Sequence, residues 1–315
     1  MKSTLGDTGI EVPPLIFGGN VFGWTANEAT SFALLDEMVA AGFNAIDTAD
    51  AYTHWAPGNR GGESETIIGN WLSRRGGRDR VVIFTKVGLL PNPDGQPLSR
   101  SNIIRAAENS LRRLRTDFID LYQVHRDDST TPLAETLEAF SRLVTAGKVR
   151  AIGASNYSAA RLGEALATSR RLGVPEFVSL QTHYNLIERS EYEQSLEPLC
   201  RAAGLGVLTY FSLAAGFLTG KYRFAADMAQ SARGPRYIGK YLNERCLRIL
   251  AALDAAAGQY GVSQAEIAIA WLIARPSVTA PIASATSLEQ LRTLFAATRI
   301  RLDDASVAAL NEAGA

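Results

Sequence analysis

The chain lacks the features of membrane-spanning, disulfide-stapled and nucleic-acid-binding proteins. No stretch approaches the roughly 20 apolar residues that a membrane-spanning helix needs. Residues 1–12 contain no apolar h-region, so we do not expect a signal peptide there. The two cysteines, Cys200 and Cys246, show neither zinc-site spacing nor a disulfide framework. Basic and acidic residues number 32 each, so net charge suggests neither a nucleic-acid nor a membrane partner. We therefore expect a soluble, cytoplasmic protein.

Several motifs of well-known enzyme classes are also missing. The chain has no G-x-G-x-x-G or Walker-type loop, and no nucleophile–base pair of the Ser–His kind is evident. A nucleotide cofactor would therefore bind without the usual Gly-rich fold. The three histidines, His54, His125 and His183, all follow predicted strands, but no His-x-His follows the first strand. Metal-dependent hydrolysis is therefore a weak alternative, and we expect no metal.

Short β-branched or aromatic runs that end in polar residues alternate with helical patterns along the chain. The predicted strands lie near residues 14–20, 45–48, 81–86, 118–125, 149–156, 177–185, 206–212 and 278–283. The predicted helices lie near residues 28–41, 64–75, 99–114, 132–147, 158–173, 190–204 and 287–297. Such alternation predicts an α/β fold with a parallel sheet, and we see no linker that would divide residues 1–315 into more than one domain.

Two further segments depart from the regular alternation. Residues 4–13 resemble a short hairpin with its turn at Asp7–Gly9. The long gap between Tyr210 and Ile282 contains two more helices and a polar stretch near 222–240 that is rich in Arg, Gly and Tyr. An insertion of this kind is a candidate lid over a functional site.

Four polar residues follow or end apolar runs: Asp47, Tyr52, Lys86 and His125. In a closed parallel barrel the carboxyl ends of the strands converge on one mouth, where the chemistry is found. Lys86 is one of only five lysines against 27 arginines, and a buried lysine without a partner is costly. We expect Asp47 to pair with it.

The chemistry of these four groups indicates proton transfer. A free tyrosine has a pKa of about 10, and a nearby ammonium lowers that value by favouring the phenolate. Tyr52 beside Lys86 could therefore protonate an oxygen that gains negative charge, as happens when hydride reduces a carbonyl, and His125 could orient that oxygen. Phe22, Trp24, His54 and Trp55 are candidates for the substrate wall, because they lie close to the predicted mouth.

The order and spacing of further motifs resemble an aldo-keto reductase over essentially the whole chain. The matching stretches are FNAIDTADAY, GESETIIGNWL, TKVG, LYQVHR, RAIGASN, QTHYN, Tyr210, GFLTGKY at 216–222 and PIASATSLEQL at 281–291. The resemblance implies a (β/α)8 TIM barrel with an N-terminal β-hairpin and extra helices between strands 7 and 8. It also implies reversible carbonyl reduction with NADPH, with NADH as a possible substitute.

The resemblance also implies a role for individual residues. Tyr52 would be the general acid, Lys86 its modulator, Asp47 the partner of Lys86, and His125 the group that orients the substrate. The cofactor would contact Gly18, Gly19, Asn20 and Asp47, then Ser155, Asn156 and Gln181 at the carboxamide, and Tyr210 at the nicotinamide ring. Ser212, Leu213, Gly216 and Lys221 would lie along the pyrophosphate, and Ser284, Thr286 and Gln290 near the adenosine 2′-phosphate.

The chain departs from the family pattern at the cofactor site. After the seventh strand it has Tyr210-Phe211-Ser212-Leu213 where the family often has Tyr-Ser-Pro-Leu. Ser284 and Thr286 stand where basic groups are usual, Leu294 replaces a usual Asn, and Arg292 is a candidate substitute. Since charge-assisted hydrogen bonds hold phosphate best, we expect a weaker NADPH preference than is typical.

Two other functions remain open from the sequence. The chain could be a catalytically slow, cofactor-binding regulatory subunit, or a Schiff-base lyase that uses Lys86.

Overall fold

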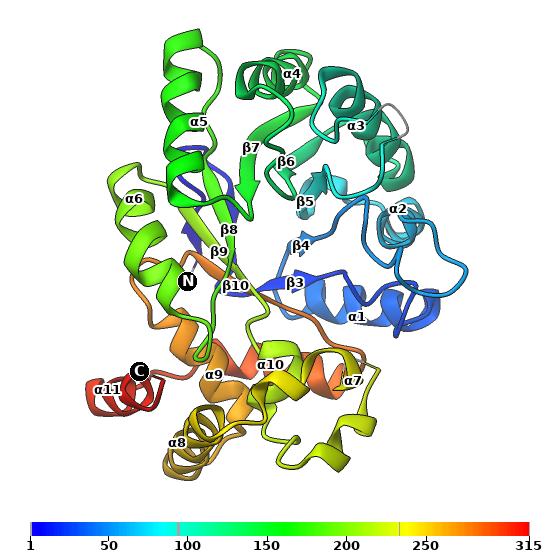
Figure 1. The fold of residues 1–315 in the computed structure, drawn as a ribbon. Coiled ribbons are helices and arrows are strands. Elements are labelled where there is room, and N and C mark those ends of the chain that lie inside the picture. Colours follow the sequence, from blue (N-terminus) through cyan, green and yellow to red (C-terminus); the bar gives the residue numbers. More distant parts are fainter. Residues whose placement is uncertain (1, 93–94, 233, 315) are drawn as a thin grey trace.

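A closed barrel of parallel strands forms the centre of the molecule (Figure 1). The computed structural model describes residues 2–92, 95–232 and 234–314. Around the barrel the strand order is β10-β3-β4-β5-β6-β7-β8-β9. The strands are β3 (Ile16–Gly18), β4 (Ala45–Asp47), β5 (Val82–Val87), β6 (Ile119–Val124), β7 (Val149–Ser155), β8 (Ser179–His183), β9 (Gly206–Tyr210) and β10 (Ala280–Ala283). The predicted (β/α)8 fold is confirmed.

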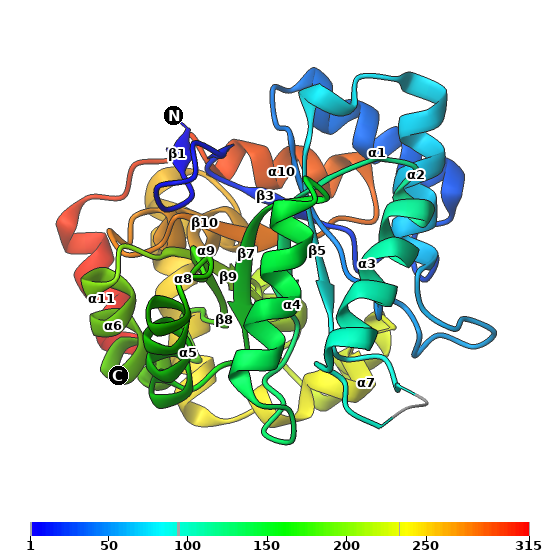
Figure 2. The same ribbon diagram turned by 90° about the horizontal axis from the view of Figure 1, so that it is seen from above.

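Helices surround the barrel and follow its strands in chain order (Figures 1 and 2). They are α1 (Glu28–Ala40), α2 (Glu63–Arg75), α3 (Arg100–Leu114), α4 (Leu133–Thr145), α5 (Ala159–Leu172), α6 (Glu197–Ala202), α7 (Gly234–Tyr237), α8 (Glu244–Tyr260), α9 (Gln264–Ile273), α10 (Leu288–Ala297) and α11 (Asp304–Ala313). Polar caps set several starts: the Ser263 hydroxyl accepts from the Glu266 amide, and the Glu266 carboxylate accepts from the Ser263 amide.

The helix predicted near 190–204 begins with an irregular turn. Residues Tyr192–Leu196 form a π-helical turn before α6 starts at Glu197. Pro198 explains the change, because proline has no amide hydrogen and its ring clashes with the carbonyl four residues earlier in a regular helix.

The predicted N-terminal hairpin is present and closes one end of the barrel. Strands β1 (Ser3–Thr4) and β2 (Glu11–Val12) pair antiparallel. Leu5, Ile10 and Val12 are buried together with inward-facing barrel residues such as Phe84 and Leu121. Figure 2 shows the hairpin at one end of the barrel and α7 at the other, which leaves the carboxyl ends of the strands clear of the hairpin.

The two extra helices predicted between the last strands are α8 and α9. The polar stretch before them is folded into short helical turns, Ala225–Gln230 and Gly239–Tyr241, with α7 between them. Tyr222, Ile238 and Tyr241 are buried in the main core cluster. The stretch therefore docks on the barrel through a few apolar anchors while most of its other side chains face solvent.

Candidate active site

The four predicted polar residues occupy the carboxyl ends of three neighbouring strands. Asp47 is the last residue of β4, Lys86 is the fifth residue of β5, and His125 follows β6 directly. Tyr52 lies in the loop after β4, where its amide donates to the carbonyl of Ala49. Pairing of β4 with β5 and of β5 with β6 brings these residues to one mouth, as the alternation of strands and helices predicted.

Asp47, Tyr52 and Lys86 form a compact triangle of charge-assisted contacts. The Lys86 ammonium donates to Oδ1 and Oδ2 of Asp47 at 2.8 and 2.7 Å, and to the Tyr52 hydroxyl at 2.8 Å. The Tyr52 hydroxyl donates to Asp47 Oδ2 at 2.8 Å. Burial lowers the pKa of Lys86, and the Asp47 carboxylate opposes that shift. A fourth acceptor, the carbonyl of Thr48 at 2.8 Å, completes the coordination of the ammonium.

The backbone directly after Tyr52 is strained. Thr53 has a φ of 67°, a left-handed conformation that is rare for a β-branched residue. Its hydroxyl is close to the Tyr52 carbonyl, at 2.7 Å, and to Glu63 Oε2, at 3.3 Å. A strained backbone of this kind persists only where surrounding contacts hold it in place. Here the contacts of the Thr53 hydroxyl hold the loop that carries the Tyr52 phenol.

His125, directly after β6, faces Tyr52 across the end of β5. Their ring centroids are 5.8 Å apart and the planes meet at 75°. Burial, together with the charges of Lys86 and Arg126, holds the pKa of His125 well below its usual range. A neutral imidazole has one N–H group, which can donate a hydrogen bond to a substrate oxygen without transferring its proton to that oxygen. Nδ1 of His125 has no hydrogen-bond partner among the described residues.

The residues expected at the nicotinamide lie close to the triangle and contact one another. Gln181 donates to Asp47 Oδ1 at 2.8 Å. Asn156, which has a φ of 56°, donates to the carbonyl of His125 at 2.8 Å and accepts from the Tyr210 hydroxyl at 2.6 Å. Ser155 ends β7 and its hydroxyl lies 3.1 Å from the Asn156 amide nitrogen. His183 stacks beneath Tyr210, with ring centroids 5.3 Å apart at 19°.

The loop after β9 has an unusual backbone where the pyrophosphate is expected. Three successive residues, Ala214, Ala215 and Gly216, have φ values of 47°, 57° and 96°. A Cβ atom at Gly216 would lie 3.8 Å from the Lys221 ammonium. Leu213 is half-buried, whereas Ser212 is buried and donates to the Ile282 carbonyl at 2.8 Å. The Ser212 hydroxyl therefore faces the barrel wall.

The first and last strands of the barrel bring a second group of expected residues together. Ser284 donates to Asn20 Oδ1 at 2.5 Å, and a Cβ atom at Gly18 would lie 2.6 Å from the Ser284 hydroxyl. Gly19 is packed tightly, since a Cβ atom there would lie 2.9 Å from the Ser64 hydroxyl.

The residues expected near the 2′-phosphate are already engaged with protein partners. Gln290 accepts from the amide and hydroxyl of Thr286 at 2.9 and 3.1 Å. Arg292, the candidate basic substitute, pairs with Glu37 at 2.8 Å.

Three of the four other residues expected at the substrate wall form an aromatic group beside Tyr52. Trp55 contacts the rings of Trp24, His54 and Tyr52 at centroid distances of 5.8, 5.5 and 6.5 Å. Phe22 differs, because it is completely buried and packs on Phe17 in the core. Phe22 therefore presents no accessible surface to a substrate in this structure.

Sequence reasoning missed a second charged group on the outer side of β5. Glu65 of α2 is completely buried, accepts from the Thr85 hydroxyl at 2.6 Å and pairs with Arg113 of α3 at 2.7 Å. Asp50, in the loop between Asp47 and Tyr52, is also buried. In the sequence, the only signal of this charged group was Asp50 itself, a second aspartate three residues after Asp47.

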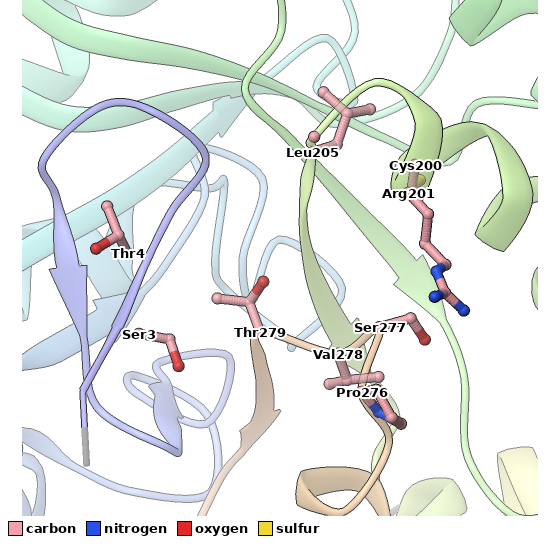
Figure 3. Close-up of a pocket in the computed structure, with 10 residues that line it drawn as sticks. Ser3, Thr4, Cys200, Arg201, Leu205, Pro276, Ser277, Val278 and Thr279 are labelled. Atoms are coloured by element: carbon pink, nitrogen blue, oxygen red, sulfur yellow. The ribbon is translucent and has the colours of Figure 1, made fainter.

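A cavity of about 320 Å³ lies at the end of the barrel opposite to this chemistry (Figure 3). Its lining comes from the hairpin and from the segments that precede β9 and β10: Ser3, Thr4, Cys200, Arg201, Gly204, Leu205, Pro276, Ser277, Val278 and Thr279. Burial raises the pKa of the Cys200 thiol to about 12, so this cysteine is not a reactive thiolate.

The described residues contain neither a metal-ligand cluster nor a membrane-spanning helix. No three His, Cys, Asp or Glu side chains in residues 2–92, 95–232 and 234–314 are grouped as a metal ion would need. In the same ranges, no helix has the length and apolar character needed to cross a membrane.

The fold is a parallel barrel with a hydrogen-bonded cluster of Asp47, Tyr52 and Lys86 at the carboxyl ends of its strands. The chain belongs to the aldo/keto reductase family, whose model matches residues 14–315. Members of this family generally use nicotinamide cofactors.

Three proteins similar to this chain over nearly its whole length are an oxidoreductase, a channel subunit and a reductase. The uncharacterized oxidoreductase YrpG of Bacillus subtilis is 36% identical over 98% of this chain and 94% of its own length. The probable voltage-gated potassium channel subunit beta of Oryza sativa is 34% identical over 91% of this chain and 88% of its own length. Versiconal hemiacetal acetate reductase of Aspergillus parasiticus is 30% identical over 98% of this chain and 95% of its own length.

Proposed function

We propose that the protein reduces an aldehyde or ketone to the alcohol, reversibly, with NADPH as the hydride donor. The contact between the Lys86 ammonium and the Tyr52 hydroxyl at 2.8 Å carries the proposal. A carbonyl oxygen gains negative charge as hydride reaches its carbon, and a phenol held by an ammonium can protonate that oxygen.

Each polar group then has one task. Tyr52 donates its proton to the substrate oxygen, and Lys86 stabilises the phenolate that remains. Asp47 keeps the buried ammonium charged and in place, because an unpaired buried charge would be costly. His125, neutral at physiological pH, donates a hydrogen bond that directs the carbonyl oxygen toward the phenol.

Several features of the chain suit a dinucleotide. When bound, the reduced nicotinamide would supply the hydride. Ser155, Asn156 and Gln181 offer amide and hydroxyl groups for a carboxamide, and Tyr210 offers a ring face. Gly216 leaves its loop without a side chain beside the Lys221 ammonium. Lys221 has no carboxylate partner in the part of the chain that the structure describes, so its charge is open to a phosphate.

The aromatic group of Trp24, His54 and Trp55 supports an apolar or aromatic substrate body beside Tyr52. Arg126 follows His125, is exposed, and adds a positive charge to the rim of the mouth. We place the reacting carbonyl between Tyr52 and His125.

Two alternatives can be separated from this proposal. A channel subunit is among the relatives, so a slow, cofactor-binding regulatory protein is the second candidate. A Schiff-base lyase would need a free Lys86 amine, whereas this ammonium is completely buried and surrounded by four acceptor atoms.

The test is steady-state turnover of 4-nitrobenzaldehyde with NADPH, followed by loss of the cofactor's absorbance. We expect a kcat within the usual enzyme range of about 1–1,000 per second on a good substrate. Tight NADPH binding without turnover on a broad carbonyl panel would instead support the regulatory candidate. Covalent trapping of Lys86 by borohydride with a carbonyl compound would support the lyase.

A further inference from the structure

The buried side chains around strand β5 contain one carboxyl group more than their cations can pair. Inside the barrel, Lys86 pairs with Asp47 at 2.7 Å. On the outer face of the strand, Arg113 pairs with Glu65 at 2.7 Å. Asp50 is the fifth titratable residue of the group and its third carboxyl group, with only 4% of its surface exposed.

Asp50 has no ionic partner in the described residues. No salt bridge involves it, and its Oδ1 atom is buried without a hydrogen-bond partner. Both carboxylate oxygens of Glu65 are already used, one by the Thr85 hydroxyl and one by Arg113. A buried carboxylate without a partner is strongly disfavoured, whereas the neutral acid is not.

The groups that face Asp50 come from four elements. Glu65 lies on α2, Arg113 on α3, Lys86 on β5 and Tyr122 on β6. Burial and the Glu65 charge raise the pKa of Asp50 to about 8. The Arg113 charge, a hydrogen bond from the Ala51 backbone amide and the Lys86 charge oppose the shift. The Tyr122 hydroxyl is also completely buried, without a partner among the described residues, and burial keeps its pKa well above the usual range.

The backbone connects Asp50 to the chemistry. Its amide donates to the carbonyl of Lys86 at 3.2 Å, and Tyr52 follows two residues later. The carbonyl of Asp50 packs against Gly61, where a Cβ atom would lie 2.8 Å from it. The backbone of Asp50 therefore holds the loop that carries the phenol against β5, and the buried Asp50 side chain lies at that point of attachment.

We propose that Asp50 is held in the folded protein as a neutral carboxylic acid, and that in this form it is a positioning residue that seats the loop between Asp47 and Tyr52 on strand β5. Ionisation would place a second negative charge beside Glu65 and push this loop away from the strand. The protonation state of Asp50 is independent of the proposed function; only its effect on turnover rests on carbonyl reduction by Tyr52.

The sign of the pH dependence follows from linkage. The folded protein holds a proton on Asp50 that the unfolded chain releases near pH 4. Stability from this group is therefore fully present below about pH 4 and is lost as pH rises through about 8. Asp50→Asn cannot ionise, so its folding equilibrium constant should gain on that of the wild type by about tenfold per pH unit between pH 5 and 8.

Asp120 provides a matched control. It is equally buried, but it pairs with Arg78 at 2.7 Å and with Arg150 at 2.6 Å. Asp120→Asn should lower stability throughout pH 5–8, in contrast to Asp50→Asn. Parallel stability curves for Asp50→Asn and the wild type would show that Asp50 is ionised and would overturn the proposal.

A spectroscopic measurement on the holoenzyme does not depend on unfolding. Infrared difference spectra with 13C-labelled aspartate should show a protonated carboxyl band at pH 7 in the wild type that Asp50→Asn removes. Absence of that band would overturn the proposal whether or not the protein reduces carbonyls.

The positioning role has its own readout. With carbonyl turnover established, the kcat of the wild type should fall above about pH 8 through a step that Asp50→Asn lacks, while KM for NADPH stays within about twofold. Identical high-pH limbs in the two proteins would leave a neutral Asp50 with no positioning role and would refute that part.

Discussion

At the scale of single residues, Tyr52 has the most direct test. Tyr52→Phe removes the hydroxyl that contacts Lys86 and Asp47 but keeps the ring. We expect kcat to fall at least about 100-fold, as for loss of a general acid, with NADPH affinity nearly unchanged. Tyr192→Phe, which removes a buried hydroxyl bonded to the Ser277 carbonyl, is the control and should retain activity. More than about a third of wild-type activity in Tyr52→Phe would exclude this phenol as the acid.

The pairing of Lys86 with Asp47 can be measured by a double-mutant cycle. Lys86→Met leaves the Asp47 carboxylate buried without its cation, which should cost about 3–5 kcal/mol of unfolding free energy. Adding Asp47→Asn should recover much of that loss without restoring turnover. The exposed pair of Lys2 and Glu11 is the control, with a coupling below about 1 kcal/mol. An equally small coupling for the buried pair would contradict the assigned geometry.

His125 should remain neutral throughout the working pH range. Its pKa lies well below the usual value near 6.5, so protonation favours the unfolded chain. The stability associated with the neutral ring is present above about pH 6.5 and is lost as pH falls toward the folded pKa. Proton NMR should show a His125 signal that does not titrate between about pH 6 and 8, and His125→Asn assigns it. A midpoint near 6.5 would contradict the burial argument.

At the scale of elements, the segment between residues 221 and 240 is the candidate lid. Lys221 is the basic residue of this segment expected along the pyrophosphate, and Arg223, Arg233, Arg236 and Lys240 are its other positive charges. In the structure Arg223 pairs with Asp254 and Lys240 with Glu188, and Arg233 lies outside the described residues.

Among the described residues of the segment, Lys221 and Arg236 therefore remain as the charges without a carboxylate partner, and each lies over an aromatic ring, that of Tyr222 and of Tyr237.

Limited proteolysis tests whether this segment closes over the cofactor. We expect trypsin to cut between about residues 222 and 240 in the free protein and saturating NADPH to protect these bonds. Lys221→Met should weaken NADPH binding, whereas Lys240→Met, whose charge is already paired, should not. Equal cutting rates with and without NADPH would make the segment an ordinary surface loop.

At the scale of the whole molecule, the sequence predicted the order of strands and helices because each element follows its own periodicity. The triangle of Asp47, Tyr52 and Lys86 was also predictable, since strand ends in a parallel barrel share one mouth. The burial of Phe22 and of Asp50 was not, because burial in this layer depends on how α2 and α3 pack against the strands. Periodicity in one segment does not contain that information.

The choice of cofactor depends on distant parts of the chain, since the expected adenosine site joins the ends of β3 and β10. Arg292 is engaged by Glu37, and Ser284 and Thr286 offer hydroxyls where a basic group would grip the 2′-phosphate. We therefore expect NADPH to bind tighter than NADH by only about 10- to 100-fold, or about 1.4 to 2.8 kcal/mol. Fluorescence titration with both cofactors measures the ratio, and Ser284→Arg should increase it by adding a charge-assisted bond. Clearly tighter binding of NADH by the wild type would reverse the assignment of the cofactor.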